Sequence, residues 1–151
     1  MGLGPEHAEE RAVAGELFSV EALLKGLSGI VIDGACRDIA KIRTIALPVY
    51  SRSVIPLSGT SEKIFQMQLP ITCGGVTVNA GDILFGDDDG IVVASTDELL
   101  ELIPIAEEIQ AAEESILKRM ETGSSLFGML NFEEHWKTIS HSGKSKLQFR
   151  I

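Results

Sequence analysis

The stretch Gly29-Ile30-Val31-Ile32-Asp33-Gly34-Ala35-Cys36-Arg37-Asp38 places a short apolar run directly before small residues and an Arg-Asp pair. The β-branched residues 30–32 are typical of a strand that is covered on both faces. Gly34 and Ala35 are expected to let the backbone turn sharply, because neither carries a large side chain. We therefore predict a strand over residues 29–33 inside a sheet, followed by a polar site.

The segments on either side of this strand predict a helix-strand unit. Residues 1–14 read as a loop that leads into a helical turn. Ser19 is a candidate N-cap for a helix over residues 20–25, and Gly26 is placed to end it. A helix of about ten residues rises ~15 Å and a strand of about five spans ~16 Å. The loop before the helix and the end of the strand are therefore expected to meet at one edge of the sheet.

Further along the chain, short extended runs alternate with turns and then give way to a long helix. Residues 39–45 predict a short helix, and a β region follows, with a hairpin turn at residues 86–90 whose acidic run lacks the ligand spacing of a calcium loop. A helix capped at residues 95–97 and closed by Gly123 carries an apolar stripe that fits a core or a subunit interface, and Pro104 predicts a kink or two helices. The remaining extended runs are expected at residues 48–50, 65–69, 76–78, 83–85 and 91–94.

The composition limits the classes of partner and compartment. With 13 basic and 22 acidic residues, the 151-residue chain has a net charge of -9, which repels nucleic-acid phosphates. No apolar run reaches the ~20 residues of a membrane helix, and the acidic N-terminus does not have a signal-peptide layout. Cys36 and Cys73 form no CxxC motif, so we expect free thiols. These observations predict a soluble cytoplasmic protein without a nucleic-acid or membrane partner.

Five motifs follow one another along the chain, namely Gly15-Glu16-Leu17, residues 29–38, Leu47-Pro48-Val49-Tyr50, Gly74-Gly75-Val76-Thr77-Val78 and residues 81–93. In this order they resemble those of the 4-hydroxy-4-methyl-2-oxoglutarate aldolases and the related regulators of ribonuclease E activity, the RraA-like family. The resemblance implies an α/β fold of the layered, swivelling β/β/α type, with a mixed sheet and a C-terminal helix. It predicts an RraA-like domain over residues 1–123 that is short at its N-terminal side, so that part of the cleft is expected to be missing, and an extension over residues 124–151 that docks on a neighbour.

The resemblance also implies the residues of an active site. It assigns Asp38 as the ligand of a divalent cation, Mg²⁺ or Mn²⁺, and Arg37 and Glu16 as catalytic residues. Substrate binding is assigned to Arg37 and to the backbone of Gly15, Glu16, Leu17 and Phe18, with a small 2-oxo acid as the substrate. Hard cations prefer carboxylate and water oxygens, and amides at a helix N-terminus favour negative charge, so the chemistry agrees with these assignments.

Simpler interpretations stand beside the catalytic one. An Arg-Asp pair is more often a helix cap with a solvated cation, and Glu16 can serve only the first helical turn. Cys36 is expected to be a small buried residue, and His135 and His141 to be surface residues.

Two functions from different classes follow. The first is a metal-dependent lyase, a class II pyruvate aldolase and oxaloacetate decarboxylase, that cleaves short 2-oxo dicarboxylates. The alternative is a non-catalytic regulator that binds a ribonuclease or another protein. In either case a homo-oligomer is expected, a homotrimer or a hexamer, because the apolar helix stripe needs a partner.

Overall fold

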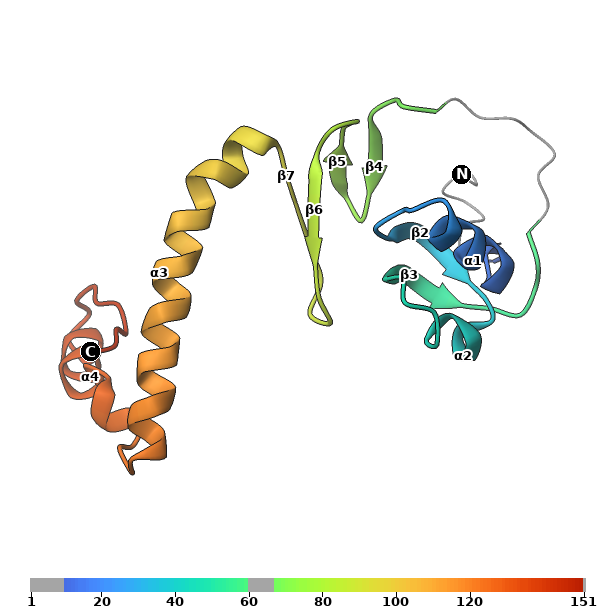
Figure 1. Ribbon diagram of the computed structural model, residues 1–151. Helices are drawn as coiled ribbons and strands as arrows, with labels where there is room; N and C mark the ends of the chain where they lie inside the picture. The colour runs from blue at the N-terminus through green and yellow to red at the C-terminus, as the bar shows by residue number, and fades with distance from the viewer. Residues whose placement is uncertain (1–9, 60–66, 151) are drawn as a thin grey trace. The chain divides into compact units, whose positions relative to one another are not determined.

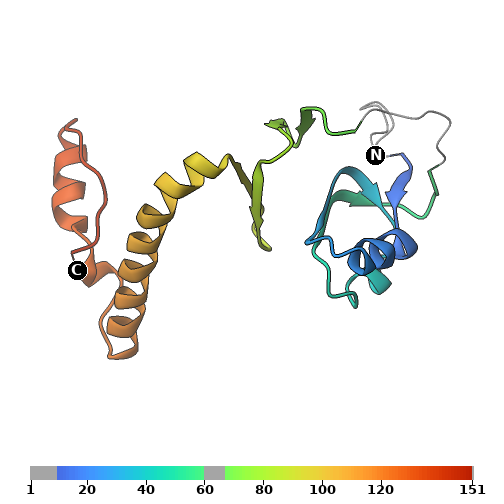
Figure 2. The same cartoon turned by 45° about the horizontal axis from the view of Figure 1, so that its top comes forward.

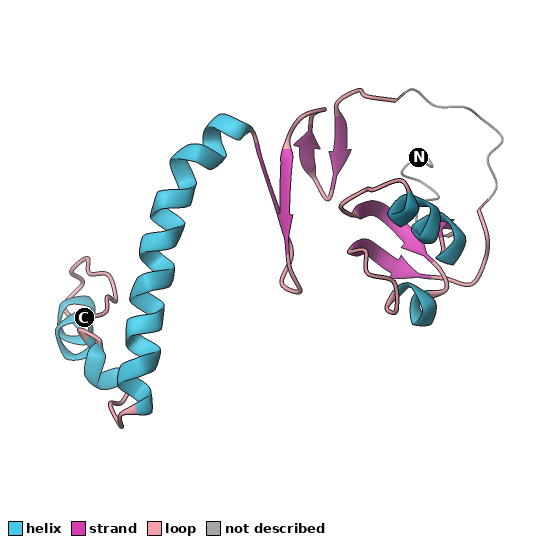
Figure 3. Cartoon of the chain, viewed as in Figure 1, coloured by secondary structure: helices cyan, strands magenta, loops and turns pink. Residues whose placement is uncertain are grey.

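The computed structural model describes residues 10–59 and 67–150, and the chain forms two compact units, Met1–Val93 and Ala94–Ile151. Figure 1 gives the order of the elements along the chain. Figure 3 shows that unit 1 carries the strands and that unit 2 consists of helices and loops after the end of β7. The predicted division into residues 1–123 and 124–151 stays a prediction.

Unit 1 is built on a three-stranded parallel sheet in the order β1-β2-β3. β1 is Ala12–Ala14, β2 is Ile30–Cys36 and β3 is Val49–Val54. Helix α1 (Glu16–Leu24) connects β1 to β2, and the short α2 (Ile39–Ile42) lies between β2 and β3. Figures 1 and 2 both show α1 lying against this sheet. The prediction of a strand inside a sheet is confirmed, since β2 is the central strand.

The end of β2 differs from the prediction. The strand continues through Gly34 and Ala35 to Cys36, so the expected sharp turn at Gly34 is wrong. The register with β3 shifts between Ile32 and Ala35, which keeps the small residues inside the sheet. The chain turns instead at Asp38, which has a left-handed backbone (φ 57°, ψ 31°). Ala35 and Cys36 are fully buried, and the core of unit 1 groups Cys36 with Ala14, Ile32 and Ile42.

Two predictions before β2 are also corrected. Residues 12–14 form a strand rather than a loop, because β1 pairs with β2 on one side and with residue 58 on the other. Helix α1 begins at Glu16 with Gly15 as its N-cap, so Ser19 does not cap it. Ser19 is fully buried inside the helix, and its Oγ donates a hydrogen bond to the Gly15 carbonyl at 3.0 Å.

The remaining strands of unit 1 form two hairpins. β4 (Ile71–Cys73) and β5 (Val76–Val78) are antiparallel, and the positive φ angles of Gly74 and Gly75 (60° and 84°) make the two-residue turn. β6 (Ile83–Gly86) and β7 (Ile91–Ala94) form a second two-stranded sheet. A connection of four residues requires antiparallel strands, so the predicted hairpin is confirmed.

The remaining predictions for this region are met only in part. The predicted extended run 65–69 lies partly outside the described residues, and residues 67–69 do not form a strand. The helix predicted over residues 39–45 is shorter, and the extended run expected at residues 48–50 is part of a longer strand, residues 49–54.

Unit 2 is led by the 26-residue helix α3 (Thr96–Glu121), which Ser95 and Glu98 cap through a reciprocal capping box. The helix runs through Pro104 as one element with a bent axis in Figure 1, so of the two predicted alternatives the structure shows the kink and not two helices. Gly123 (φ 96°) closes it as predicted, where Ser124 N–H donates to the Arg119 carbonyl. A 3₁₀ turn η1 (Phe127–Met129) and helix α4 (Phe132–Ser140) follow.

The predicted apolar stripe of α3 is only partly covered within the chain. Ile116 is buried, whereas Ile103 and Ile109 remain 41% and 57% exposed. His141 is exposed as expected, but His135 is half-buried, and its Nδ1 is enclosed by its surroundings. The core expected under the stripe is therefore limited to its C-terminal part.

The predicted fold class is confirmed: the protein is α/β, with parallel and antiparallel strand pairs and a long C-terminal helix. Cys36 and Cys73 are free thiols, as expected. Among the described residues, no helix has the length and apolar character needed to span a membrane.

Candidate functional site

The carboxyl ends of β1 and β2 lie side by side, because the two strands are parallel and Ala14 is in register with Cys36. The Arg37 N–H donates to the Ala14 carbonyl at 3.0 Å, so the residues that follow the two strands are neighbours. Helix α1 begins directly after β1. The expected meeting of the loop before the helix with the end of the central strand is therefore confirmed.

Asp38 connects the two chain segments through one carboxylate oxygen. Its Oδ2 accepts a hydrogen bond from the Glu16 N–H at 3.2 Å and lies 3.5 Å from Arg37 Nε. The side chains of Arg37 and Asp38 are 40% and 42% exposed, so their ion pair adds little to stability. The arrangement keeps a guanidinium and a carboxylate at the surface of one depression, where both can reach a ligand.

Gly15 allows the side chains of Arg37 and Asp38 to lie close to the start of α1, because it has no side chain of its own. A Cβ at this position would lie 2.4 Å from Asp38 Oδ2 and 2.9 Å from Arg37 Cγ, which are distances that real Cβ atoms do not reach. The backbone of Gly15 is extended (φ -151°), so the requirement for glycine comes from this close approach and not from the backbone angle.

The first turn of α1 supplies backbone donors to the same place. The leading N–H groups of a helix have no partner within the helix, and Gly15 offers no side chain to cap them. The Asp38 carboxylate accepts the hydrogen bond of the Glu16 amide. The amides of Leu17 and Phe18 belong to the same turn. The positive end of the helix dipole favours an anion there.

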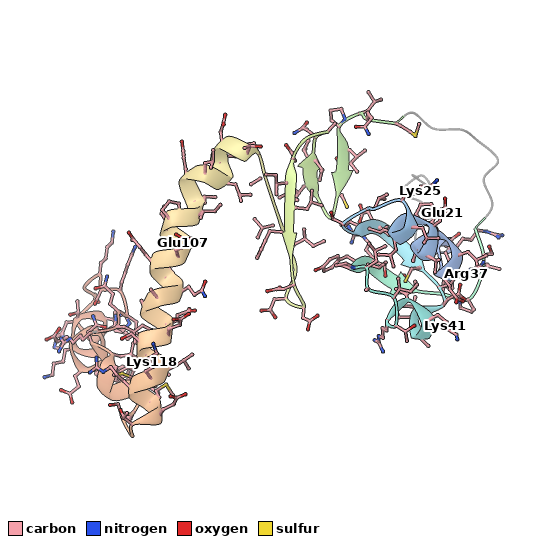
Figure 4. The ribbon with its side chains drawn as sticks, in the orientation of Figure 1. Glu21, Lys25, Arg37, Lys41, Glu107 and Lys118 are labelled. Atoms are coloured by element: carbon pink, nitrogen blue, oxygen red, sulfur yellow. The ribbon has the colours of Figure 1, made fainter. Side chains whose placement is uncertain are left out.

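These residues surround a surface pocket of about 180 Å³. Each residue that the sequence predicts for the site lines it, namely Gly15, Glu16, Leu17, Phe18, Arg37 and Asp38. Figure 4 labels Arg37, which lies beside α1. The pocket brings the predicted residues together, and their roles stay predictions.

Sequence reasoning missed the other wall of the pocket. This wall contains β1 together with Ser58 and Gly59. Residues 57–59 are held against β1 by two hydrogen bonds, from Ala12 N–H to the Leu57 carbonyl (2.8 Å) and from Gly59 N–H to the Ala12 carbonyl (2.9 Å). The available signal was the Ser-Gly pair soon after the end of a third parallel strand, since such ends share one edge of a sheet.

The oxygen ligands of the pocket fit a hard cation that takes most of its other ligands from water and from the substrate. Within residues 10–59 and 67–150, no group of three or more His, Cys, Asp or Glu side chains is placed to hold a metal ion. Asp38 contributes one partly exposed carboxylate. Mg²⁺ is commonly bound through one or two carboxylates, with water and substrate oxygens completing the octahedron, so a site of this kind suits Mg²⁺ or Mn²⁺ and not a structural Zn²⁺.

Comparison with known proteins places residues 4–93 in a match to the RraA-like family model, described as Aldolase/RraA. An uncharacterized protein of Methanocaldococcus jannaschii is 37% identical over 124 residues, covering 82% of this chain and 60% of that protein. A protein of Halalkalibacterium halodurans, named "Putative 4-hydroxy-4-methyl-2-oxoglutarate aldolase", is 32% identical over 105 residues, covering 70% of this chain and 50% of the relative.

A solved structure gives the same grouping. RraAS2 of Streptomyces coelicolor, described as an unusual member of the RNase ES inhibitor RraA protein family, superposes with a TM-score of 0.66 at 26% identity. The match covers 75% of this chain and 59% of that one. The chain thus spans between 50% and 60% of the length of these three relatives.

Proposed function

This chain belongs to the RraA-like family, Aldolase/RraA, and we propose that it is a divalent-metal-dependent lyase acting on short 2-oxo dicarboxylates. The proposed reactions are aldol cleavage of 4-hydroxy-4-methyl-2-oxoglutarate and decarboxylation of oxaloacetate, each of which yields pyruvate. The observation that carries the proposal is the convergence of Arg37, Asp38 and the first amides of α1 on one pocket. A cation, a metal-binding carboxylate and oriented N–H donors are the groups that such a reaction needs.

Arg37 and the amides of α1 would bind the 2-oxo acid end of the substrate. The guanidinium offers a planar pair of donors that matches a carboxylate, and its Nε lies 3.5 Å from Asp38 Oδ2. The amides of Leu17 and Phe18 would donate to the oxygen on which negative charge grows as the enolate of pyruvate forms. Because the α1 backbone is already ordered, these donors need no rearrangement during the reaction.

Asp38 would hold the divalent cation, which as a Lewis acid would polarise the keto oxygen of the bound substrate. The Glu16 N–H keeps the Asp38 carboxylate oriented through Oδ2. The same contact restrains a residue in the left-handed region, where a carboxylate side chain is tolerated but not favoured.

Glu16 is the proposed proton carrier, because it lines the pocket and its carboxylate belongs to the first residue of α1. Aldol cleavage requires removal of the proton from the substrate hydroxyl and return of a proton to the enolate carbon. Decarboxylation of oxaloacetate requires only the second transfer, since carbon dioxide leaves without a hydroxyl proton. Glu16→Gln is therefore expected to slow aldol cleavage more than decarboxylation.

The direct test is pyruvate release from both substrates, with Mg²⁺ and with a chelator. Asp38→Asn should abolish the Mg²⁺-dependent rate, because the amide keeps the shape of the side chain but not the charge that binds a hard cation. Asp88→Asn, in the exposed turn between β6 and β7, is the matched control and should keep the wild-type rate. Full activity of Asp38→Asn would refute the assigned role.

The second candidate function is a non-catalytic regulator that binds a ribonuclease. The likeness to RraAS2, from a family described by RNase inhibition, is the observation that favours it. Absence of metal-dependent pyruvate release in the wild type, together with saturable binding to a purified ribonuclease of the E type, would select this function over the lyase.

A further inference from the structure

Unit 2 has two apolar helix faces that its own fold leaves largely exposed. The first is on α3, where Leu102, Ile105 and Ile109 follow one another at intervals of three and four residues and so lie on one side of the helix. They are 52%, 53% and 57% exposed. The same side is buried farther along, at Ile116, toward the end of α3 from which η1 and α4 continue (Figure 1). We call Leu102, Ile105 and Ile109 the α3 face.

The second face is on α4, where Phe132, Trp136 and Ile139 are spaced by four and three residues. Trp136 is 60% exposed, and Phe132 and Ile139 are exposed as well. Phe132 is held in place by an edge-on contact with Phe127, whose ring centre lies 5.7 Å away. A large exposed aromatic residue beside two further apolar ones is typical of the centre of a protein–protein contact. We call Phe132, Trp136 and Ile139 the α4 face.

The α3 face lies among acidic side chains. Residues 96–114 contain seven acidic residues and no basic one. Glu101 and Glu108 each come directly before a residue of the α3 face, and because they are seven positions apart they flank it on the same side. Any surface that covers the α3 face therefore meets a strongly negative field, which favours a basic partner.

The α4 face has the opposite surroundings. Residues 131–150 contain four basic and two acidic residues. One of the acids, Glu134, is ion-paired with Arg150, so three lysines are left against a single glutamate. This segment is thus positive within a chain whose net charge is -9. It offers the kind of surface that the α3 face favours.

The charges decide which faces can pair. Two α3 faces brought together would place seven acidic residues against seven, and two α4 faces would gather the lysines, so neither face suits itself. An α3 face against an α4 face buries apolar side chains on both and sets acidic against basic residues. Within one chain this pairing is not made, because the α3 face stays more than half exposed with α4 in place. The complementary surface is the one that a second copy presents.

We propose that copies of this chain associate through unit 2, with the α3 face of one copy packed against the α4 face of the next. Both faces lie after residue 93, where the match to the family model ends, so the contact is one that the shared domain does not supply. Because two different faces meet, the contact is satisfied in a reciprocal pair or in a closed ring. It does not involve the pocket at Asp38, and its tests need neither metal nor substrate.

Trp136 reports on this contact directly, because it is the only tryptophan of the chain and belongs to the α4 face. On association its indole leaves water, so the emission maximum of the full chain should shift to shorter wavelength as the concentration rises. Sedimentation velocity over the same dilution series should show the mass rising above that of one chain, with the same midpoint. Agreement of the two midpoints would assign the association to the α4 face.

Ile105→Gln removes an apolar contact from the α3 face and leaves Trp136 in place as the reporter. Because burial of an isoleucine side chain contributes strongly to association, this variant should raise the dissociation constant about tenfold or more and move both midpoints together. Leu24→Gln, a similar change at an exposed leucine of α1, is the matched control and should keep the wild-type midpoints. Circular dichroism should show the same helix content in both variants as in the wild type.

Charge reversal tests whether the two faces meet each other. Glu101→Lys with Glu108→Lys should weaken association roughly fivefold or more, because like charges then oppose one another across the contact. Lys137→Glu with Lys144→Glu should have the same effect from the other side. Combining all four substitutions restores opposite charges and should recover most of the wild-type affinity.

Lys41→Glu with Arg43→Glu is the matched control for charge, since it reverses two exposed residues at α2 and should keep the wild-type affinity. A mass of one chain at every concentration would overturn the inference. An association that leaves the emission of Trp136 unchanged, or that tolerates Ile105→Gln, would overturn it as well, because it would use another surface. Failure of the four combined substitutions to recover affinity would show that the α3 and α4 faces do not meet.

Discussion

Replacement of Gly15 by alanine is the perturbation that addresses the site most directly. The added methyl would lie 2.4 Å from Asp38 Oδ2, 2.9 Å from Arg37 Cγ and 3.1 Å from Arg37 Nε. Alanine accepts the extended backbone of residue 15, so the cost arises from these contacts. The closest atom is the end of a side chain, and the Asp38 carboxylate is therefore expected to withdraw from the Glu16 amide.

The size of the effect follows from what is lost. A hydrogen bond to a charged group contributes about 1.5–3 kcal/mol. Because the Asp38 side chain is 42% exposed, the lower end of this range applies, and we expect a destabilisation of about 1–2 kcal/mol. The fold should survive that loss. A displacement of about 1 Å at a catalytic group can cost ~100-fold in rate, so activity should fall far more than stability.

Three measurements test this expectation. Thermal unfolding should show a lower Tm by several degrees, and pyruvate release should fall about 100-fold. Amide hydrogen exchange at Glu16 should become faster, because its acceptor has moved, and this readout does not depend on activity. Gly29→Ala is the control, since its Cβ would meet only the Pro48 carbonyl oxygen at 3.3 Å and the Pro48 Cβ. Wild-type turnover and a protected Glu16 amide in Gly15→Ala would refute the reasoning.

Three further predictions concern the Arg37 side chain, the loss of stability at acidic pH and the oligomeric state. Arg37→Lys should lower kcat/KM by about 100-fold without unfolding the chain, because a point charge replaces a planar fork, and unchanged kinetics would remove Arg37 from the site. The hydrogen bond from Arg52 lowers the pKa of Asp33, so its stabilising contribution is present above the ordinary pKa and is lost as the pH falls through the lowered one. Chemical unfolding between pH 6 and pH 3 should therefore show a steeper loss for the wild type than for Asp33→Asn, and parallel curves would contradict this. We also propose a homo-oligomer, a trimer by family resemblance, that covers the exposed Leu100 and Ile109 of α3; light scattering that gives the mass of one chain at micromolar concentration would argue against it.

The place of Arg37 and Asp38 at the edge of a sheet was predictable from sequence because both residues follow directly after a recognisable strand, whereas residues 15–18 were assigned by the family resemblance. The apolar run at residues 30–32 marks a buried strand, and a polar pair after such a strand must lie at a sheet edge. The hairpin turn at residues 86–90 was predictable for a similar reason, since two short extended runs flank it. In these segments the local chemistry and the final environment favour the same structure.

The start of α1 was not predictable from local signals. Ser19 is a good N-cap by residue type, but the helix begins four residues earlier than predicted, at Glu16, whose amide donates to Asp38, 22 positions along the chain. Once the helix extends to Glu16, Ser19 is internal and bonds back to the Gly15 carbonyl. A tertiary contact therefore overrides the preference of a single capping residue.

β1 and the turn after β2 show the same limit. Three residues with two alanines have little strand propensity, and β1 exists because both of its edges are paired. Gly34 suggested a turn, but the parallel partners on both sides of β2 keep that segment extended, and the reversal is made at Asp38, a non-glycine residue with positive φ. The sequence analysis placed the turn at Gly34, because glycine is the more flexible residue. The structure uses the side chain of Asp38 to hold an unusual backbone angle in place.

The chemistry and the architecture of unit 1 depend on the same contact. The hydrogen bond from the Glu16 amide to Asp38 starts α1, holds the left-handed turn that ends β2 and orients the carboxylate proposed to bind the cation. Any ligand that draws Asp38 away from Glu16 would weaken the first turn of the helix, whose amides are proposed to bind the same ligand. The divalent cation and the substrate are therefore expected to bind cooperatively. Each favours the geometry in which Asp38 Oδ2 stays bonded to the Glu16 amide and the other carboxylate oxygen of Asp38 is available to the pocket.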